Sequence, residues 1–435
     1  MSDLSRRRFL GSLGIAALHP VLGRPWLGDE LGVSKELGFA PLDSASPASR
    51  GVRVRAITAG IAIERIADRD AVERALGVLA RARSRFEAEG YEVQTTRVTM
   101  PPVIAALDAK ARIAALAPIA DIDGLVSAKG AVCSLGPVWT ADRLEPELAE
   151  WSAELVKQTK ATSFSVVVAS PSGNVHAHGA MVAAQVMHAV AGAVPNGKGS
   201  FRFAAAANIP AGTPFFPVGW HDGASSLAVG CETADLVHAA FDGASSVEDG
   251  RRRLSGRLTT ELRAVERIAA DISKSEKLVY RGIDPSPAPL GAHSIGAALE
   301  ALSGVPFGDA GTLRACAVVT DVLKSLPIQQ CGYAGLMLPV LEDAVLAKRA
   351  VEKRYGLRDL LLFSSVCGTG LDVVPIPGDT PIETLANIIV DVAAQSVKLR
   401  KPLSVRLYLI PDAKVGDAVH VDDPLLTDSI VFRAT

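Results

Sequence analysis

The chain has 435 residues, of which 49% are hydrophobic and 21% are charged, and 45 Lys and Arg stand against 47 Asp and Glu for a net charge of −2. This composition is typical of a globular protein with a sizeable core and excludes a disordered chain. Because no basic excess exists to hold a polyanion, we expect no nucleic-acid partner.

The first residues resemble an export signal peptide. Residues 5–11 read Ser-Arg-Arg-Arg-Phe-Leu-Gly, and a mildly apolar run follows to residue 22. Paired arginines before Phe-Leu are typical of a twin-arginine signal, and the apolar run is about half as long as a membrane span requires. We therefore expect a signal peptide over 1–23, a flexible tether over 24–50, and an exported, periplasmic or extracytoplasmic protein with no stable membrane span.

Strand and helix patterns alternate along the rest of the chain. Apolar strand patterns occupy residues 52–61, 91–98, 164–169, 201–207 and 403–410, and amphipathic helix patterns occupy 72–86 and 258–272. Such alternation predicts an α/β fold with a largely parallel sheet or barrel. No low-complexity linker and no internal repeat interrupts the pattern, so we expect a single domain over 51–435.

The cysteines do not predict a disulfide framework. Cys133, Cys231, Cys316, Cys331 and Cys367 are odd in number and widely spaced, without a Cys-x-x-Cys motif. At least one thiol is therefore expected to be free. Buried free cysteine is the simpler interpretation, and a reactive cysteine is the alternative.

Four segments rich in Gly, Pro and reactive side chains are interpreted as loops, at 208–223, 283–289, 329–339 and 365–381. In parallel α/β folds, loops at the carboxyl ends of strands collect the functional groups. We therefore expect the four loops to meet at the mouth of a barrel and to form a pocket for a small-molecule ligand.

The first two loops carry an imidazole and a carboxylate suited to acid–base chemistry. His221 follows a Pro-stiffened, aromatic stretch and precedes Asp222. In the second loop, alternating prolines would hold Asp284 and Ser286 in fixed directions. A rigid surface loop and a structural turn are the alternative interpretations of these two segments.

The third and fourth loops add a thiol, a carboxylate and two glycines. Gly332 and Gly335 permit close approach of the backbone to a ligand, and Cys331 would be reactive only beside a cation or a helix end. Cys367 and Asp372 are candidates for the site. Binding candidates over the four loops are Asn208, Ser286, Tyr333, Gly335 and Asp379.

Two further patterns have structural interpretations. Thr380 and Glu383, with Pro381 between them, predict a capping box for a helix that runs to about Arg400. His176-x-His178 would place two imidazoles on one face of a strand, as in a metal site, but the residues that follow favour a helix, on which they diverge. We assign no metal ligand.

Several motifs together resemble the domain-of-unknown-function 711 family, also called uncharacterised protein family 0210, over residues 52 to about 430. They are Arg55–Gly60, Asn208-x-Pro210, Gly219-x-His221, Asp284-x-Ser286-Pro287, Cys367-x-x-Gly370-Leu371-Asp372, Pro375–Thr384 and Asp423–Leu426. The resemblance implies a divergent branch of the ten-stranded α/β barrel of glycyl radical enzymes. The family's biochemical role is unassigned, so it transfers no catalytic roles. Residues 128–195 and the export signal depart from the family pattern.

An active glycyl radical enzyme is not expected. Cys331-Gly332-Tyr333-x-Gly335 has a superficial likeness to the glycyl-radical signature, but Gln329 stands where that signature requires an arginine. An oxygen-exposed compartment would also quench a glycyl radical.

These observations favour an exported enzyme that acts on a small polar metabolite in a barrel-mouth pocket. His221, Asp284 and Asp372 are its acid–base candidates, with Cys367 near them. A ligand-binding protein without turnover would use the same loops and is the main alternative. A structural role and a homo-oligomer stay open. The sequence names no cofactor. Asp222, Asp284 and Asp372 would form a metal site with His221 only if the four side chains converge.

Overall fold

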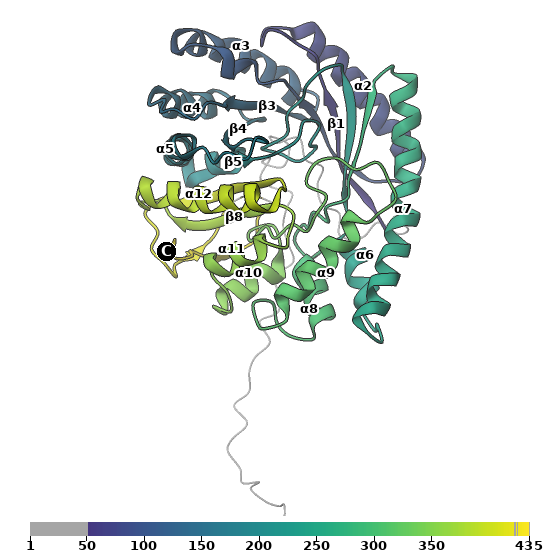
Figure 1. Cartoon of the computed structure of the whole chain (residues 1–435). Helices are drawn as coiled ribbons and strands as arrows, with labels where there is room; N and C mark the ends of the chain where they lie inside the picture. The colour runs from purple at the N-terminus through teal and green to yellow at the C-terminus, as the bar shows by residue number, and fades with distance from the viewer. Residues whose placement is uncertain (1–50, 422, 424, 435) are drawn as a thin grey trace, which may run out of the picture. The chain divides into compact units, whose positions relative to one another are not determined.

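The computed structural model of the chain describes residues 51–421, 423 and 425–434, and the expected signal peptide over 1–23 and tether over 24–50 lie outside these residues. Strands and helices alternate along the described chain (Figure 1). The strands and helices predicted from the apolar patterns are all present. The α/β class predicted from the sequence is therefore confirmed.

A nine-stranded sheet runs through the described residues in the order β7-β6-β1-β2-β3-β4-β5-β9-β8. Neighbouring strands are parallel, except that β1 pairs antiparallel with β6 and β5 pairs antiparallel with β9. The strands are β1 (Arg53–Gly60), β2 (Val93–Thr99), β3 (Ala131–Trp139), β4 (Thr162–Ala169), β5 (Phe203–Ala207), β6 (Ser226–Glu232), β7 (Val279–Asp284), β8 (Gly370–Pro377) and β9 (Leu403–Ile410), with a separate pair β10 (Ala418–Val419) and β11 (Ser429–Ile430).

Helices cover the outer face of this sheet (Figure 1). They are α2 (Arg69–Ala88), α3 (Ala109–Ser127), α4 (Glu147–Gln158), α5 (Ala177–Ala193), α6 (Ala234–Phe241), α7 (Val247–Ser275), α8 (Ile295–Ser303), α9 (Thr312–Lys324), α10 (Ala344–Val351), α11 (Leu357–Ser364) and α12 (Ile382–Leu399), with 3₁₀ turns η1 (Val103–Ala106) and η2 (Pro195–Arg202). Within the described range, no helix has both the length and the apolarity needed to cross a bilayer.

Each strand presents one set of side chains to the helices and another to the inner face, because side chains alternate along a strand. On β5, Phe203, Ala205 and Ala207 join the main hydrophobic core, which the helices share. Ala204 and Ala206 belong instead to a separate inner cluster that includes Phe215 of the loop after β5. The inner face is thus covered by loops rather than helices.

The segment that follows α9 touches both edge strands of the sheet. Gln330 forms an isolated parallel bridge with Ile283 of β7, and Pro339 forms one with Asp372 of β8. The backbone N–H of Val340 also donates to the carbonyl of Asp372 at 3.2 Å. These single bridges do not amount to a tenth strand, so the observed architecture is a large, mostly parallel sheet with helices.

The interpretation of 365–381 as one loop is wrong, because Gly370–Pro377 is strand β8. The apolar residues of this stretch are buried and pair with β9 in parallel register. Glycine and proline at both ends of the strand obscured the pattern. Asp372 therefore projects from a strand, whose backbone is more rigidly held than that of a loop.

The predicted capping box is also wrong. Pro381 is the N-cap of α12, and no side chain caps this helix end. The hydroxyl of Thr380 instead donates to the carbonyl of Pro377 at 2.7 Å and closes the turn after β8. Because the helix begins one residue later than predicted, Glu383 does not occupy the position that a capping box requires.

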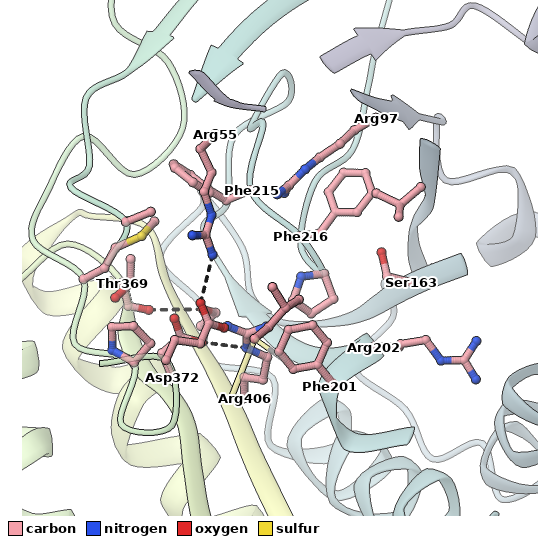
Figure 2. Close-up of a pocket in the computed structure, with 18 of the residues that line it drawn as sticks. Arg55, Arg97, Ser163, Phe201, Arg202, Phe215, Phe216, Thr369, Asp372 and Arg406 are labelled. Atoms are coloured by element: carbon pink, nitrogen blue, oxygen red, sulfur yellow. Dashed lines mark hydrogen bonds and ion pairs between the residues drawn. The ribbon is translucent and has the colours of Figure 1, made fainter. Parts of the chain in front are cut away.

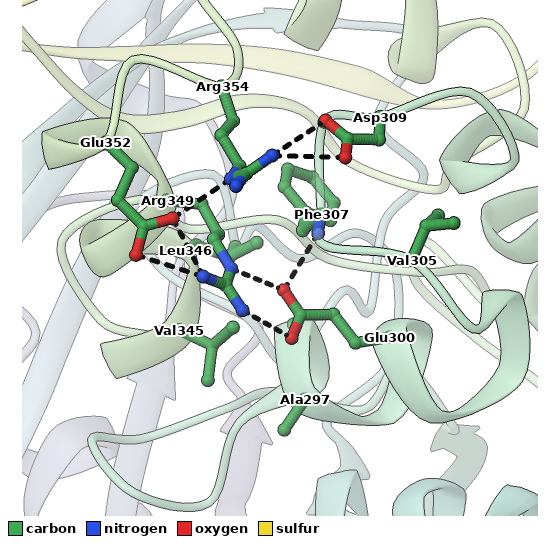
Figure 3. A network of polar contacts seen from close by, with 12 residues as sticks. Ala297, Glu300, Val305, Phe307, Asp309, Val345, Leu346, Arg349, Glu352 and Arg354 are labelled. Atoms are coloured by element: carbon green, nitrogen blue, oxygen red, sulfur yellow. Dashed lines mark hydrogen bonds and ion pairs between the residues drawn. The ribbon is translucent and has the colours of Figure 1, made fainter. Parts of the chain in front are cut away.

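An ion-pair network joins α8 to α10 and to the chain on either side of them (Figure 3). Arg349 contacts both oxygens of Glu300 at 2.6 and 2.9 Å and pairs with Glu352 at 2.7 Å. Arg354 continues the network from Glu352 to Asp309. Since both Glu300 oxygens meet the planar guanidinium, the two helices are held in a defined register.

Candidate functional site

A pocket with a cavity volume of about 100 Å³ lies against the inner face of the sheet. Strands β1 to β4, β8 and β9 contribute to its lining, as do the loops after β5 and β7 and the segment after α9 (Figure 2). This volume admits several waters or a small ligand. The charged side chains that line it are Arg55, Arg97, Lys160, Arg202, Arg406, Glu342 and Asp372.

Glu342 joins arginines from two distant strands across the pocket. Its Oε2 accepts from Arg55 of β1 at 3.0 Å, and its Oε1 accepts from Arg406 of β9 at 2.8 Å (Figure 2). Arg406 also donates through Nε to Oδ1 of Asp372 on β8 at 2.6 Å. Two cations and two carboxylates therefore form one continuous chain of charge.

Arg406 is fully charged at neutral pH despite its burial. Burial lowers its pKa, but the ion pairs with Asp372 and Glu342 outweigh that effect, and the net pKa is raised above the usual arginine value. Its guanidinium lies 4.8 Å from the ring centroid of Phe201. The aromatic face restricts the arginine, so its direction toward the two carboxylates is held.

Arg97 of β2 lines the same pocket without a carboxylate partner among the described residues. Its side chain donates to the hydroxyl of Thr95 at 3.0 Å and to the carbonyl of Pro214 at 3.1 Å. Its guanidinium lies 4.9 Å from the ring centroid of Phe216. Burial is the main reason that its pKa falls to about 9, and the nearby Arg55 lowers it further.

The partly buried Arg202 also belongs to the lining, but its hydrogen bonds lie outside the cavity. Arg202 donates to the carbonyls of Val156 and Thr159 and to the Thr159 hydroxyl. Figure 2 shows its guanidinium directed away from Arg55 and Arg97. Arg202 therefore fastens the end of α4 to the sheet.

A row of hydroxyls forms another wall of the pocket. Tyr333 donates to the hydroxyl of Ser404 on β9 at 2.7 Å, and Ser404 donates to the carbonyl of Thr369 at 3.1 Å. The hydroxyl of Thr369 is buried and has no hydrogen-bond partner in the described structure. Burial raises the pKa of Tyr333 above its usual value, so its phenol stays protonated. The free Thr369 hydroxyl remains available to a ligand.

Asp284, at the end of β7, holds the loop that carries Tyr333. Its Oδ1 accepts from the backbone N–H and hydroxyl of Ser286 at 3.1 and 2.6 Å and from the N–H of Ala334 at 3.1 Å, and its Oδ2 accepts from the N–H of Tyr333 at 2.7 Å. Burial raises its pKa to about 6, against the opposing effect of these hydrogen bonds. Asp284 does not line the pocket and acts on it through Tyr333.

His221 is buried beside the start of β6. Its Nδ1 lies 3.2 Å from the hydroxyl of Ser226, and its Nε2 lies 3.2 Å from the carbonyl of Gly223. Both contacts are satisfied when Nε2 carries the proton, and burial lowers the pKa of the ring. The neutral imidazole packs against Gly60, where an added Cβ would lie 2.2 Å from Nδ1. The pocket lining does not include His221.

Cys367 is buried at the end of α11, and the pocket lining does not include it. Its backbone carbonyl accepts a hydrogen bond from Lys401, which also donates to the carbonyls of Ser364 and Ser365 at 2.6 and 3.0 Å. All five cysteines are free thiols. Burial raises the pKa of Cys331 well above its usual value, so its thiol lacks the activation that reactivity requires.

The remaining binding candidates have structural contacts. Asn208 donates to the hydroxyl of Ser396 at 2.9 Å. The hydroxyl of Ser286 accepts from the N–H of Gly335 at 3.1 Å. Asp379 is exposed in the turn before α12. Of the nine candidates predicted from the sequence, Asp372 and Tyr333 are therefore the two that line the pocket.

The residues that sequence reasoning missed are charged residues of the strands and of the segment after α9. Arg97, Arg406 and Glu342 were not proposed, and Arg55 entered only as part of the family motif. Arg97 and Arg406 each interrupt a stretch that is otherwise uncharged within its strand. A charged side chain in a strand buried on both faces requires a partner, and that was the available signal.

No group of three or more His, Cys, Asp or Glu side chains gathers into a metal site within the part of the chain that the structure describes. His176 is the N-cap of α5 and His178 lies in its first turn, so the pair follows the helical interpretation. The backbone N–H groups of His178 and Gly179 donate to Asp142, which caps the helix.

Comparison with known proteins finds one family. A model described as Uncharacterised ACR (DUF711) matches residues 48–422. A UPF0210 protein of Pyrobaculum aerophilum is 34% identical over 230 residues, covering 50% of this chain and 51% of the relative. A UPF0210 protein of Pyrobaculum islandicum is 30% identical over 353 residues, covering 75% and 76%. The match to the first thus spans about half of that relative's length. Neither name states an activity.

Proposed function

This chain belongs to the DUF711 family, and we propose that it is an enzyme that acts on a small polar metabolite in the inner-face pocket, with Asp372 as its general base. Membership of this family transfers no activity to the chain, because the family's name assigns no reaction. The proposal therefore depends on the chemistry of this pocket alone.

The observation that carries the proposal is the unequal use of the two pocket carboxylates. Both oxygens of Glu342 are occupied, one by Arg55 and one by Arg406. Asp372 uses Oδ1 for Arg406, and its Oδ2 has no hydrogen-bond partner among the described residues. Asp372 therefore retains an oxygen that can accept a proton from a bound ligand, whereas Glu342 has a positioning role.

The surroundings of Asp372 suit proton transfer. Arg406 holds the carboxylate from one side, so its orientation is set before a ligand enters. Tyr333 and Thr369 supply hydroxyls to the same pocket, and that of Thr369 is unpaired. A proton donor and a proton acceptor therefore face one cavity, as acid–base catalysis requires.

The test is Asp372→Asn, which keeps the shape of the side chain and removes its basicity. The purified protein is incubated with pools of small polar metabolites, and consumption is followed by mass spectrometry. A positioned general base contributes roughly 100- to 10,000-fold to a rate, so turnover by the variant should fall at least 100-fold. Asp379→Asn, on an exposed side chain outside the pocket, is the matched control.

Two outcomes would overturn the proposal. One is an Asp372→Asn rate equal to that of the wild type. The other is a compound that raises the melting temperature of the wild type and is recovered unaltered, which would support a binding protein without turnover.

We propose in addition that the sheet and the segment after α9 wrap into a barrel-like wall related to the ten-stranded barrel. The bridges of Gln330 to β7 and of Pro339 to β8 support this, since they place one segment against both edges. Slow amide exchange at Cys331 and Val340, whose N–H groups donate to Ile283 and Asp372, is the expected result. Exchange at the rate of an unprotected amide would contradict it.

Export in the folded state is likewise a proposal, supported by Arg6 and Arg7 before Phe9 and Leu10. Lysine at both arginine positions should abolish export while leaving the protein folded inside the cell, which fractionation would detect. Undiminished export of the double variant would contradict the assignment.

A further inference from the structure

We propose that the ligand of the inner-face pocket is a small organic acid whose carboxylate binds to Arg97. This inference rests on the proposed function, which it deepens by naming the class of substrate. It is carried by the contacts of Arg97 and by the pairing of the other arginines that line the pocket.

Arg97 is a buried cation whose guanidinium has hydrogen-bond donors without a partner among the described residues. Its side chain is 6% exposed, yet its two hydrogen bonds go to neutral oxygens, the Thr95 hydroxyl through Nε and the Pro214 carbonyl through Nη1. Nη2 has no hydrogen-bond partner among the described residues. A guanidinium so placed has lost water on one side without gaining a carboxylate, which makes an anionic ligand its natural partner.

The direction of Arg97 is held before any ligand binds. The ring of Phe216 covers one face of its guanidinium at 4.9 Å, and the bonds to Thr95 and Pro214 hold two edges. Figure 2 shows the guanidinium directed toward the cavity that Arg55 also faces. Little side-chain entropy is therefore lost when a carboxylate binds.

The pairing of the arginines in the lining favours one negative charge over two. Arg55 and Arg406 are offset by Glu342 and Asp372 in the ion-pair chain. Arg202 points away and donates to backbone carbonyls, so Arg97 is the guanidinium that faces the cavity without a carboxylate partner among the described residues. A carboxylate neutralises it, whereas a phosphate dianion would place an additional negative charge near Glu342 and Asp372.

The rest of the pocket defines the size and character of the acid. Phe215 and Met337 present apolar surface, and the volume of about 100 Å³ suits a ligand of a few carbon atoms. Asp372 and the unpaired hydroxyl of Thr369 supply polar groups for a hydroxyl or a mobile proton on the ligand. A short hydroxy acid meets each of these features.

The experiment uses lactate and 3-hydroxybutyrate as probes, lactamide and 3-hydroxybutyramide as their uncharged matches, and inorganic phosphate as a different anion. Calorimetric titration of the purified full chain should show that both acids bind and that each amide binds at least 10-fold more weakly. Losing a hydrogen-bonded charge partner weakens binding roughly 10- to 100-fold, and Arg97→Gln should show this loss for the acids alone. Arg97→Lys keeps the charge and should retain part of the affinity, and Arg81→Gln, an exposed control, should bind as the wild type does.

The inference is overturned if neither acid binds, if the amides bind as well as the acids, or if phosphate binds more tightly than either acid. Failure of Arg97→Gln to fold leaves Arg97→Lys and the acid–amide comparison in the wild type as decisive measurements. Asp372→Asn separates the two proposals. Retained acid binding with unchanged turnover would refute the assignment of Asp372 and leave the inference about Arg97 intact.

Discussion

The buried carboxyl of Asp284 should make the stability of the protein fall between pH 4 and pH 7. Two opposing effects act on it, since burial disfavours the charged form while four hydrogen bonds from N–H and O–H groups favour it. The net pKa is about 6, against an ordinary value of 3.8. Burial therefore wins, and the folded state holds this proton more tightly than the unfolded chain does.

The sign and size of the effect follow from linkage. A group with a raised folded-state pKa contributes stability that is present in full below the unfolded pKa, near 4, and is lost as the pH rises through the folded pKa, near 6. At about 1.36 kcal/mol per pKa unit, the total change is about 3 kcal/mol. Between pH 5 and pH 7 the expected loss from this carboxyl is about 1 kcal/mol.

Urea unfolding of the wild type and of Asp284→Asn at pH 5, 6 and 7 would measure this effect. Asparagine cannot titrate, so the wild type should lose about 1 kcal/mol relative to the variant over this range. Asp379→Asn, on an exposed side chain, should leave the pH dependence of the wild type unchanged. If the wild type instead gains stability relative to Asp284→Asn as the pH rises, the hydrogen bonds dominate and the reasoning fails.

Two further substitutions test contacts that hold the site. Gly332→Ala should destabilise the protein by about 2–4 kcal/mol, because φ is +69° and the added Cβ would lie 2.1 Å from Oδ2 of Asp284. The control Gly223→Ala, at φ +68° with open space around it, should lower the free energy of unfolding by only about 1 kcal/mol. Equal losses of the two variants in urea unfolding would contradict the clash with Asp284. Lys401→Met should lower the free energy of unfolding by about 2–3 kcal/mol, because buried carbonyls after α11 lose their hydrogen-bond donor. The exposed control Lys398→Met should be near neutral. A melting temperature unchanged in both variants would contradict a stabilising role for Lys401.

The elements of the fold were predictable because their patterns are local. The strands at 52–61 and 403–410 and the helices at 72–86 and 258–272 were read from apolar periodicity, and the structure contains all four. Strand β8 was missed because Gly and Pro mark its ends as strongly as they mark a turn. Local sequence patterns also do not predict that β5 pairs with β9, because the two strands are separated by almost half the chain.

The pocket was predictable only in part, because its chemistry depends on partners that are distant in sequence. Asp372 and Tyr333 were proposed from their neighbours in the chain, and both line the pocket. The ion pair of Arg55 with Glu342 joins residues 287 positions apart, and periodicity carries no information on such a contact. Asp284 was proposed as a catalyst because the neighbouring prolines hold its side chain in one direction. In the structure its carboxylate instead accepts a hydrogen bond from the backbone N–H of Tyr333.

Glu342 connects β1 to β9, which lie near opposite ends of the described chain, and this determines when ligand affinity can form during folding. Arg55 and Arg97 are synthesised early, whereas Glu342, Asp372 and Arg406 come late. No fragment that lacks β1 or β9 contains the complete set of charges, so affinity for a ligand can arise only after both strands have joined one sheet. Ligand binding would therefore report on completion of the whole sheet, and a refolding chain should recover it last.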